Sequence, residues 1–142
     1  MSLTKLIAPL LLTAFAGLAV AAPPPKAVLL DHSSSAVMDA DTARSLLREG
    51  IPAKVWKVYP ASKWAFSSQV EGGITGNGTC VITARVMLLP LTPTMKATLF
   101  RPHKTATVFD AQPGSSADQC RDLAKGKLKQ AIESVVSSLA KT

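Results

Sequence analysis

Catalysis by a nucleophile and a histidine base needs a histidine beside a serine or cysteine, and this chain of 142 residues contains two histidines. His32 follows Asp31 and precedes Ser33–Ser35, but neighbours along a chain do not build a catalytic triad. His103 follows Pro102 in an expected hairpin turn, and the chain has no G-x-S-x-G motif. Both histidines are expected to be exposed loop residues. A small secreted hydrolase that uses one of these two histidines is one alternative function for this chain.

Acidic side chains are sparse, with nine in the whole chain. A metal site needs three or four close ligands. The dense groups are Asp31-His32 and Asp39–Asp41, and helix capping explains the second group better. Glu71 and Asp110 lack the nearby second carboxylate that glycoside cleavage needs, and Gly72–Gly78 lacks the lysine and the following helix of a phosphate-binding loop. We therefore expect no catalytic residues, no metal and no cofactor, and the protein is expected not to be an enzyme.

Basic and aromatic residues alternate in one segment. Lys54–Tyr59 reads KVWKVY, and Lys63-Trp64 follows shortly after, so this segment contains both tryptophans and the single tyrosine. Such a surface can stack sugars or bases, or anchor a protein partner. Aromatic residues in strands are also typical of cores, and a core position is favoured for Trp64.

Residues 1–21 are typical of a secretory signal peptide. Lys5 gives the positive start, Leu6–Val20 the apolar run, and Ala19–Ala21 a cleavage site of small residues. The apolar run is shorter than the roughly 20 residues of a spanning helix. We therefore expect a periplasmic or secreted protein, with no transmembrane segment in the mature chain.

The mature chain is expected to be basic. Its formal net charge falls from +7 to +6, because Lys5 is the one charged residue before the cleavage site. A basic exported protein tends towards anionic partners such as lipopolysaccharide, peptidoglycan, nucleic acid or an acidic protein. The charges are dispersed along the chain, which also fits a role in solubility.

The chain has two cysteines, Cys80 and Cys120. Two cysteines in an exported protein indicate one disulfide. The alternative, two free thiols of which one is a nucleophile, fits poorly with an oxidising compartment.

Thr79–Leu89, TCVITARVMLL, has the clearest alternation of apolar residues. It predicts a central antiparallel strand with one deeply buried face. Cys80, Ile82, Ala84, Val86 and Leu88 would share that face, and the disulfide would pin the last helix to it.

Further strands are expected at Ala27–Leu30, Ala53–Tyr59, Trp64–Glu71, Met95–Arg101 and Thr105–Ala111. A strict two-residue turn at Asn77-Gly78 would turn Trp64, Phe66 and Val70 away from the buried face of the central strand. A bulge at Gly72-Gly73, or a three-residue turn at Gly76–Gly78, would return them to it.

Two helices are expected. The first spans about Thr42–Glu49, with Asp39 or Asp41 as its cap and Gly50 at a left-handed position after its end. The second starts at a capping box of Ser116 and Gln119 and ends near Leu139. Its apolar face is formed by Cys120, Leu123, Ala124, Leu128, Ala131, Ile132, Val135 and Leu139, and its outer face is basic, with Arg121, Lys125 and Lys129.

These elements predict an α+β fold, with a four- to five-stranded antiparallel sheet, a long C-terminal helix packed on one face and a short N-terminal helix. The expected organisation is a signal peptide at 1–21, a proline-rich lead and loop at 22–35, and a single domain at 36–142. The register argument places five residues together on the other face of the sheet, as a candidate interaction surface: Lys54, Trp56, Gln69, Arg85 and Met87.

The leading functional hypothesis is a small exported binding protein without catalysis, which contacts another envelope or secreted protein in an inhibitor-like or immunity-like role. The first alternative is a basic binder of an anionic envelope polymer, through the basic face of the last helix.

Overall fold

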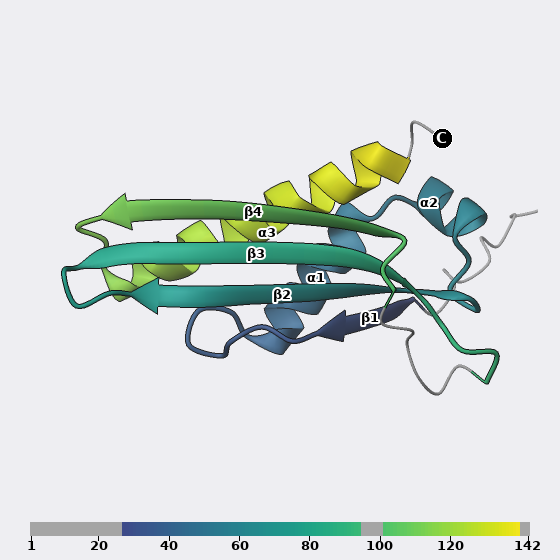
Figure 1. Ribbon diagram of the computed structural model, residues 1–142, viewed down its shortest axis with the longest axis horizontal. Coiled ribbons are helices and arrows are strands. Elements are labelled where there is room, and N and C mark those ends of the chain that lie inside the picture. The colour runs from purple at the N-terminus through teal and green to yellow at the C-terminus, as the bar shows by residue number, and fades with distance from the viewer. Residues whose placement is uncertain (1–26, 95–100, 140–142) are drawn as a thin grey trace, which may run out of the picture.

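A computed structural model of the protein describes residues 27–94 and 101–139 (Figure 1). The elements are β1 (Val28–Asp31), α1 (Ala40–Gly50), α2 (Ala53–Val58), β2 (Trp64–Ile74), β3 (Thr79–Pro90), β4 (Lys104–Pro113) and α3 (Ala117–Leu139). The predicted α+β class is confirmed, with a long C-terminal helix and a short N-terminal one. The expected signal peptide, the residues 22–26 of the proline-rich lead and the residues 95–100 of a predicted strand lie outside the described residues.

The sheet has the strand order β1-β2-β3-β4 and is mixed. β1 runs parallel to β2, while the other two pairings are antiparallel. Parallel neighbours need a crossover connection of a dozen or more residues, and the segment with α1 and α2 supplies it. The edge strand predicted at Ala27–Leu30 is therefore present. It belongs to the folded domain, so the predicted domain start at residue 36 is too late.

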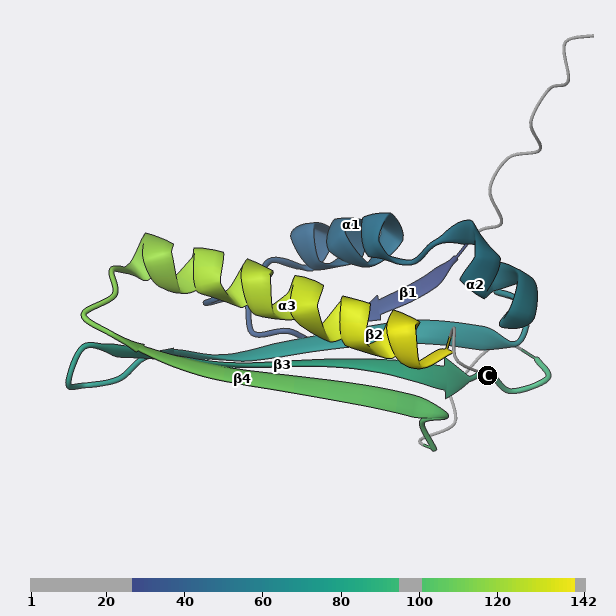
Figure 2. The same cartoon turned by 90° about the horizontal axis from the view of Figure 1, so that it is seen from above.

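β3 is the predicted central strand, and its alternation determines the core. Cys80, Ile82, Ala84, Val86 and Leu88 are fully buried, and Phe66 and Val70 of β2 join them, as predicted. Both α1 and α3 cover this inner face of the sheet (Figure 2). The opposite side, called the outer face below, has no helix of residues 27–94 and 101–139 packed against it (Figure 2).

β2 and β3 are joined by the three-residue turn Gly76–Gly78, which confirms one of the two predicted alternatives. The Thr75 N–H donates to the Thr79 carbonyl at 2.8 Å, and from the turn the ladder continues without interruption to Trp64 at the start of β2.

The predicted bulge at Gly72-Gly73 is wrong, because both residues pair in the regular ladder. Gly72 has a φ of 132°, and a Cβ there would lie 1.9 Å from the Val81 carbonyl oxygen. Because Gly72 has no Cβ, the backbones of β2 and β3 can approach closely at this position.

α1 begins at the predicted cap Asp39, whose carboxylate accepts the Thr42 N–H at 2.8 Å. The predicted role of Gly50 is wrong: it is the last helical residue, and Ile51 follows in an extended conformation. Gly50 instead lies against α3, where a Cβ would be 2.7 Å from Cγ2 of Ile132. Glycine is thus needed for the close approach of the two helices.

The Asp39→Ala substitution is expected to lower the melting temperature, because the first turn of α1 loses its acceptor. Hydrogen bonds from Thr42 lower the pKa of Asp39 below its ordinary value. The charged Asp39 carboxylate therefore stabilises the folded state above its unfolded-state pKa of about 3.9. This stabilisation is lost as the pH falls through the lower folded-state pKa. Thermal unfolding at a series of pH values should show the difference from the parent protein shrinking in acid. An Asp39→Asn control keeps the cap without the charge. A difference independent of pH would contradict the prediction.

The predicted strand at Ala53–Tyr59 is wrong, because these residues form the short helix α2 and its C-cap. Ile51, Val55 and Tyr59 are buried and lie four residues apart, which is a helical spacing. The Val55 N–H donates to the Pro52 carbonyl and the Tyr59 N–H to the Val55 carbonyl. The burial of these three residues therefore favours a helix over the strand that the alternation of KVWKVY predicts.

α3 is the predicted long helix. The Ser116 hydroxyl accepts the Gln119 N–H while the Gln119 side chain accepts the Ser116 N–H, which confirms the capping box. Its predicted apolar face is buried against the sheet, with Leu123 partly buried. The predicted Cys80–Cys120 disulfide is present and fastens the first turn of α3 to β3.

β4 covers the strand predicted at Thr105–Ala111 and pairs with β3. Across residues 27–94 and 101–139, no helix has the length and apolar character needed to cross a membrane.

Candidate functional site

The outer face of the sheet is open over its central part. The side chains that point to it from β2, β3 and β4 alternate with the buried ones and are mostly exposed or half-buried: Gln69, Glu71, Val81, Thr83, Arg85, Met87, Thr105, Thr107 and Phe109. Towards one end the face closes, since Ala65, Ser67 and Leu89 are buried.

Arg85 occupies the middle of this open region. It pairs across the sheet with Gln69 of β2 and Thr107 of β4. Gln69, Glu71, Thr83 and Arg85 line a shallow depression of about 100 Å³. The Glu71 carboxylate accepts a hydrogen bond from the Gln69 amide at 2.6 Å. Within the described part of the chain, no carboxylate lies within ion-pair distance of Arg85.

Two large apolar side chains flank Arg85. Met87 is the next residue of β3 on the same face, and Phe109 lies on β4 opposite Thr83. Phe109 has a large apolar ring of the kind that a core position could bury, yet the residue is 64% exposed. An unpaired arginine between a methionine and an exposed phenylalanine has the composition of an interface hot spot.

The structure brings together three of the five residues predicted for the interaction surface. Gln69, Arg85 and Met87 lie on the outer face, as the register argument required. Lys54 and Trp56 do not, because they belong to α2. Trp56 packs edge-to-face on Phe66 at the inner face, with ring centroids 5.3 Å apart, so its predicted place beside Arg85 is wrong.

The first helix does not cover the outer face either, because α1 packs beside α3 over the inner face (Figure 2). Phe109 is the residue of the outer face that the sequence argument missed. The signal was available, since Thr105, Thr107 and Phe109 alternate with Ala106 and Val108, which pack against the core.

The remaining aromatic residues of the basic segment meet at one end of the sheet. Tyr59 and Trp64 pack edge-to-face at 5.4 Å, and the His103 ring lies within 5.6 Å of both rings. The Tyr59 hydroxyl and His103 Nε2 are 3.4 Å apart. The aromatic signal is therefore largely explained by packing: Tyr59 is buried and Trp64 half-buried.

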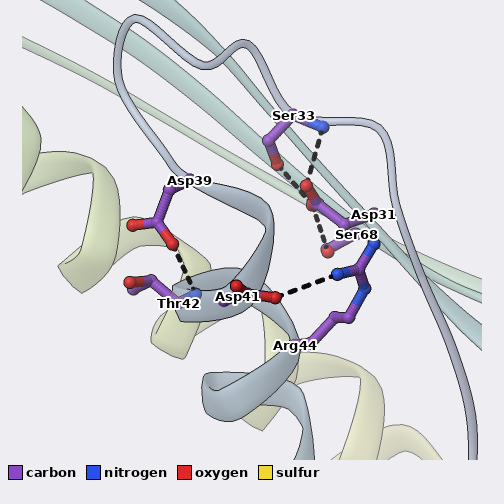
Figure 3. A network of polar contacts seen from close by, with 7 residues as sticks. All are labelled: Asp31, Ser33, Asp39, Asp41, Thr42, Arg44 and Ser68. Atoms are coloured by element: carbon purple, nitrogen blue, oxygen red, sulfur yellow. Dashed lines mark hydrogen bonds and ion pairs between the residues drawn. The ribbon is translucent and has the colours of Figure 1, made fainter.

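His32 and Asp31 do not form a catalytic pair. The Asp31 carboxylate accepts hydrogen bonds at 2.7 Å from the hydroxyls of Ser33 and Ser68 (Figure 3). The Ser33 hydroxyl in turn accepts the Val70 N–H at 2.9 Å. This network fastens the end of β1 to β2, and Asp31 followed by Ser33 is a pattern typical of an Asx turn.

Both histidines are exposed. In the residues that the structure describes, neither lies within hydrogen-bond distance of a serine, cysteine or carboxylate side chain. No group of three metal-ligating side chains comes together in the same residues.

The basic outer face of α3 is partly neutralised. Arg121 pairs with Asp118, and Lys125 pairs with Asp122. Lys127, on another side of the helix, contacts Asp110 of β4 at 2.6 Å. The hydrogen bond from Lys127 lowers the pKa of Asp110, which acts here as a structural partner of α3.

No family model matches the chain, and no curated protein matches it. Among solved structures, one that resembles it is a protein of Caulobacter crescentus CB15 proposed to be a lipoprotein. The two share 14% sequence identity at a TM-score of 0.43, over 80% of this chain and 88% of the other. A likeness of this extent identifies neither a family nor a function. Fold and site thus define a one-disulfide α+β domain with an open sheet face.

Proposed function

We propose that this is an exported, non-enzymatic binding protein that docks an acidic envelope or secreted protein against its outer face. The disulfide supports export, because disulfides persist in oxidising compartments. The compartment that fits best is the periplasm or the exterior of the cell, as the N-terminal sequence predicts.

The observation that carries the proposal is Arg85 in the open centre of the outer face, where no carboxylate of the described residues pairs with it. A guanidinium offers two parallel donors to a carboxylate. Phe109 and Met87 beside it supply apolar area that a partner can cover. An acidic side chain of the partner that binds Arg85 between Phe109 and Met87 would pair with the guanidinium. It would also bring the partner's surface over the two apolar side chains.

The Arg85→Glu substitution is expected to weaken binding of that partner by at least about 30-fold, the effect of losing a hot spot of about 2 kcal/mol. Because Arg85 is exposed, the fold should remain intact. The mature protein serves as bait in its own envelope extract. The dissociation constant of the captured protein is then measured for each variant by calorimetry.

Lys129→Glu is the matched control, since it makes the same change of charge at an exposed position of α3. It should leave binding of the partner unchanged. Equal binding by the Arg85→Glu variant and the parent protein would refute the proposed site, provided that both variants unfold at similar temperatures.

The polymer alternative has weaker support, because ion pairs already engage Arg121 and Lys125. Ionic strength separates the two functions. Polymer binding should weaken steeply with added salt, whereas docking of a protein on a mixed polar and apolar face should weaken much less.

A further inference from the structure

Basic side chains gather at one end of the sheet, where β1, β2 and β4 begin and α2 lies beside them (Figure 1). The Leu91 N–H donates to the Lys63 carbonyl at 2.8 Å, which holds the segment before β2 against the end of β3. The His103 N–H donates to the Leu88 carbonyl at 2.8 Å and holds the segment before β4 there too. We call α2 and the segments 59–64 and 101–104 the basic end. It contains five basic residues: Lys54, Lys57, Lys63, Arg101 and Lys104.

The positive charge of the basic end is not neutralised by acidic side chains. None of the nine acidic residues of the chain falls within 50–70 or 72–109. Among the described residues, none of the five basic side chains has a carboxylate within ion-pair distance. Four of the acidic residues belong to the second halves of β2 and β4 and to the first two turns of α3, towards the opposite end of the sheet: Glu71, Asp110, Asp118 and Asp122. The charge is therefore polarised along the sheet.

α2 adds an exposed apolar residue to the basic end. Lys54, Lys57 and Val58 have the i, i+3, i+4 spacing of one helix face, and all three are exposed. Val58 is 68% exposed, whereas Val55 and Tyr59 of the same segment are buried. An apolar side chain between two lysines can contact an apolar layer while the lysines contact charged groups above it.

Aromatic contacts fix the basic segments relative to one another. The His103 ring lies 5.6 Å from the Tyr59 ring and 5.3 Å from the Trp64 ring, measured between centroids. These contacts join the end of α2 to the segment before β4, so the charges of both are held at one end of the domain. Trp64 is half-buried there, and tryptophan and tyrosine are the residues enriched at membrane–water interfaces.

We propose that the basic end binds the surface of a bilayer that contains anionic phospholipids. The lysine and arginine side chains pair with the headgroup phosphates, and Val58 enters the headgroup layer. Such attraction acts within about a Debye length of the surface, so it requires basic residues gathered at one end of the domain. The binding is reversible, because a few basic residues and one apolar side chain do not equal a spanning helix.

Two observations favour a lipid surface over a soluble anionic polymer. The first is the exposure of Val58, because a polymer in water offers no apolar layer to this side chain. The second is the place where the chain enters the domain. Val28 of β1 pairs with Ala65, beside Trp64, and the apolar run Leu6–Val20 precedes it along the chain. Because the predicted signal peptide is the part that enters the membrane during export, the domain is joined to that part at its basic end.

The proposed contact is separate from the outer face. The open region of that face is centred on Arg85 in the middle of β3, and towards the basic end the face is closed by Ala65, Ser67 and Leu89. Binding of a bilayer through the basic end therefore leaves the open region accessible to a protein partner.

Cosedimentation of the mature protein with vesicles is the first test. The parent protein should bind vesicles made of phosphatidylcholine and phosphatidylglycerol in equal parts, and should not bind vesicles of phosphatidylcholine alone. The Lys57→Glu/Lys63→Glu double variant should bind the anionic vesicles at least about 25-fold more weakly, since each basic residue near such a surface contributes about fivefold. Both residues are exposed, so the fold should remain intact.

Lys125→Glu/Lys129→Glu is the matched control. It makes the same change of net charge at two exposed positions of α3, outside the basic end. Its binding to the anionic vesicles should stay within about threefold of the parent protein, because charges beyond a Debye length of the surface are screened. An equal loss in both double variants would overturn the proposal, since it would show attraction by net charge without a defined site.

Val58→Trp tests the contact with the apolar layer. On anionic vesicles this variant should bind more tightly than the parent protein, and its tryptophan fluorescence should shift to the blue. Inorganic polyphosphate serves as the soluble polyanion and should give neither change. Binding of polyphosphate by the parent protein, with no blue shift of the variant on vesicles, would assign the basic end to an anionic polymer and overturn the lipid proposal.

A parent protein that does not bind the anionic vesicles at low ionic strength also overturns the proposal. Arg85→Glu should leave binding to the vesicles within about threefold of the parent protein. Lys57→Glu/Lys63→Glu should in turn leave capture of the protein partner unchanged. The docking of a partner on the outer face and the binding of a bilayer at the basic end can therefore fail separately.

Discussion

Phe66→Ala should lower the free energy of unfolding by about 3–5 kcal/mol, as truncation of a buried aromatic residue does. Phe66 is fully buried on the inner face, where it pairs with Leu88 of β3 and packs edge-to-face on Trp56 of α2. The substitution thus removes one of the contacts by which α2 packs on the sheet, the contact with Trp56, and leaves a cavity there. Small domains have about 5–15 kcal/mol of stability, so this change removes a large part of it.

Urea unfolding followed by circular dichroism measures the effect as a shift in the transition midpoint at unchanged slope. Phe109→Ala is the matched control, because it is the same truncation on the same sheet at a residue that is 64% exposed. It should cost less than about 0.5 kcal/mol. A cost for Phe66→Ala as small as that of Phe109→Ala would show that the core is not packed around this ring.

Loss of the Cys80–Cys120 disulfide should cost about 4 kcal/mol. The bond closes a loop across a sequence separation of 40 residues, and the chain-entropy model gives this value for a loop of that length. The bond joins the central strand to the first turn of α3, so its loss frees the unfolded chain while the capping box and the apolar face of α3 remain.

The test compares the urea unfolding of the oxidised protein with that of the Cys80→Ala/Cys120→Ala double variant. Addition of a reducing agent should destabilise the parent protein by a similar amount and leave the double variant unchanged, which separates the bond from the loss of sulfur atoms in the core. A difference below about 1 kcal/mol between oxidised and reduced protein would contradict the estimate.

Much of the fold could be predicted where the signal was local. The alternation of Thr79–Leu89 depends on one strand and correctly identified its buried face, although Leu89 on the other side is buried as well. The cap at Asp39 and the capping box of Ser116 and Gln119 each involve residues three apart, so their side-chain chemistry suffices to predict them. The disulfide followed from the export signal together with the number of cysteines.

α2 shows where local reasoning was insufficient. Six residues fit both an alternating and a helical period, and the contacts of Val55 and Tyr59 with the core decide between them. Trp56 belongs to α2 and lies at the inner face. The predicted interaction surface therefore does not include two of its five residues, Lys54 and Trp56.

The sequence by itself determined the buried face of β3 and of α3, because that pattern is set by the period of a single element. The tertiary structure alone decided that β1 pairs parallel with β2, that α1 lies on the same face as α3, and that Arg85 and Phe109 are left on an open face. These features depend on contacts between residues far apart in the chain. Several arrangements satisfy the local patterns equally well, and the packing of all the elements together selects one of them.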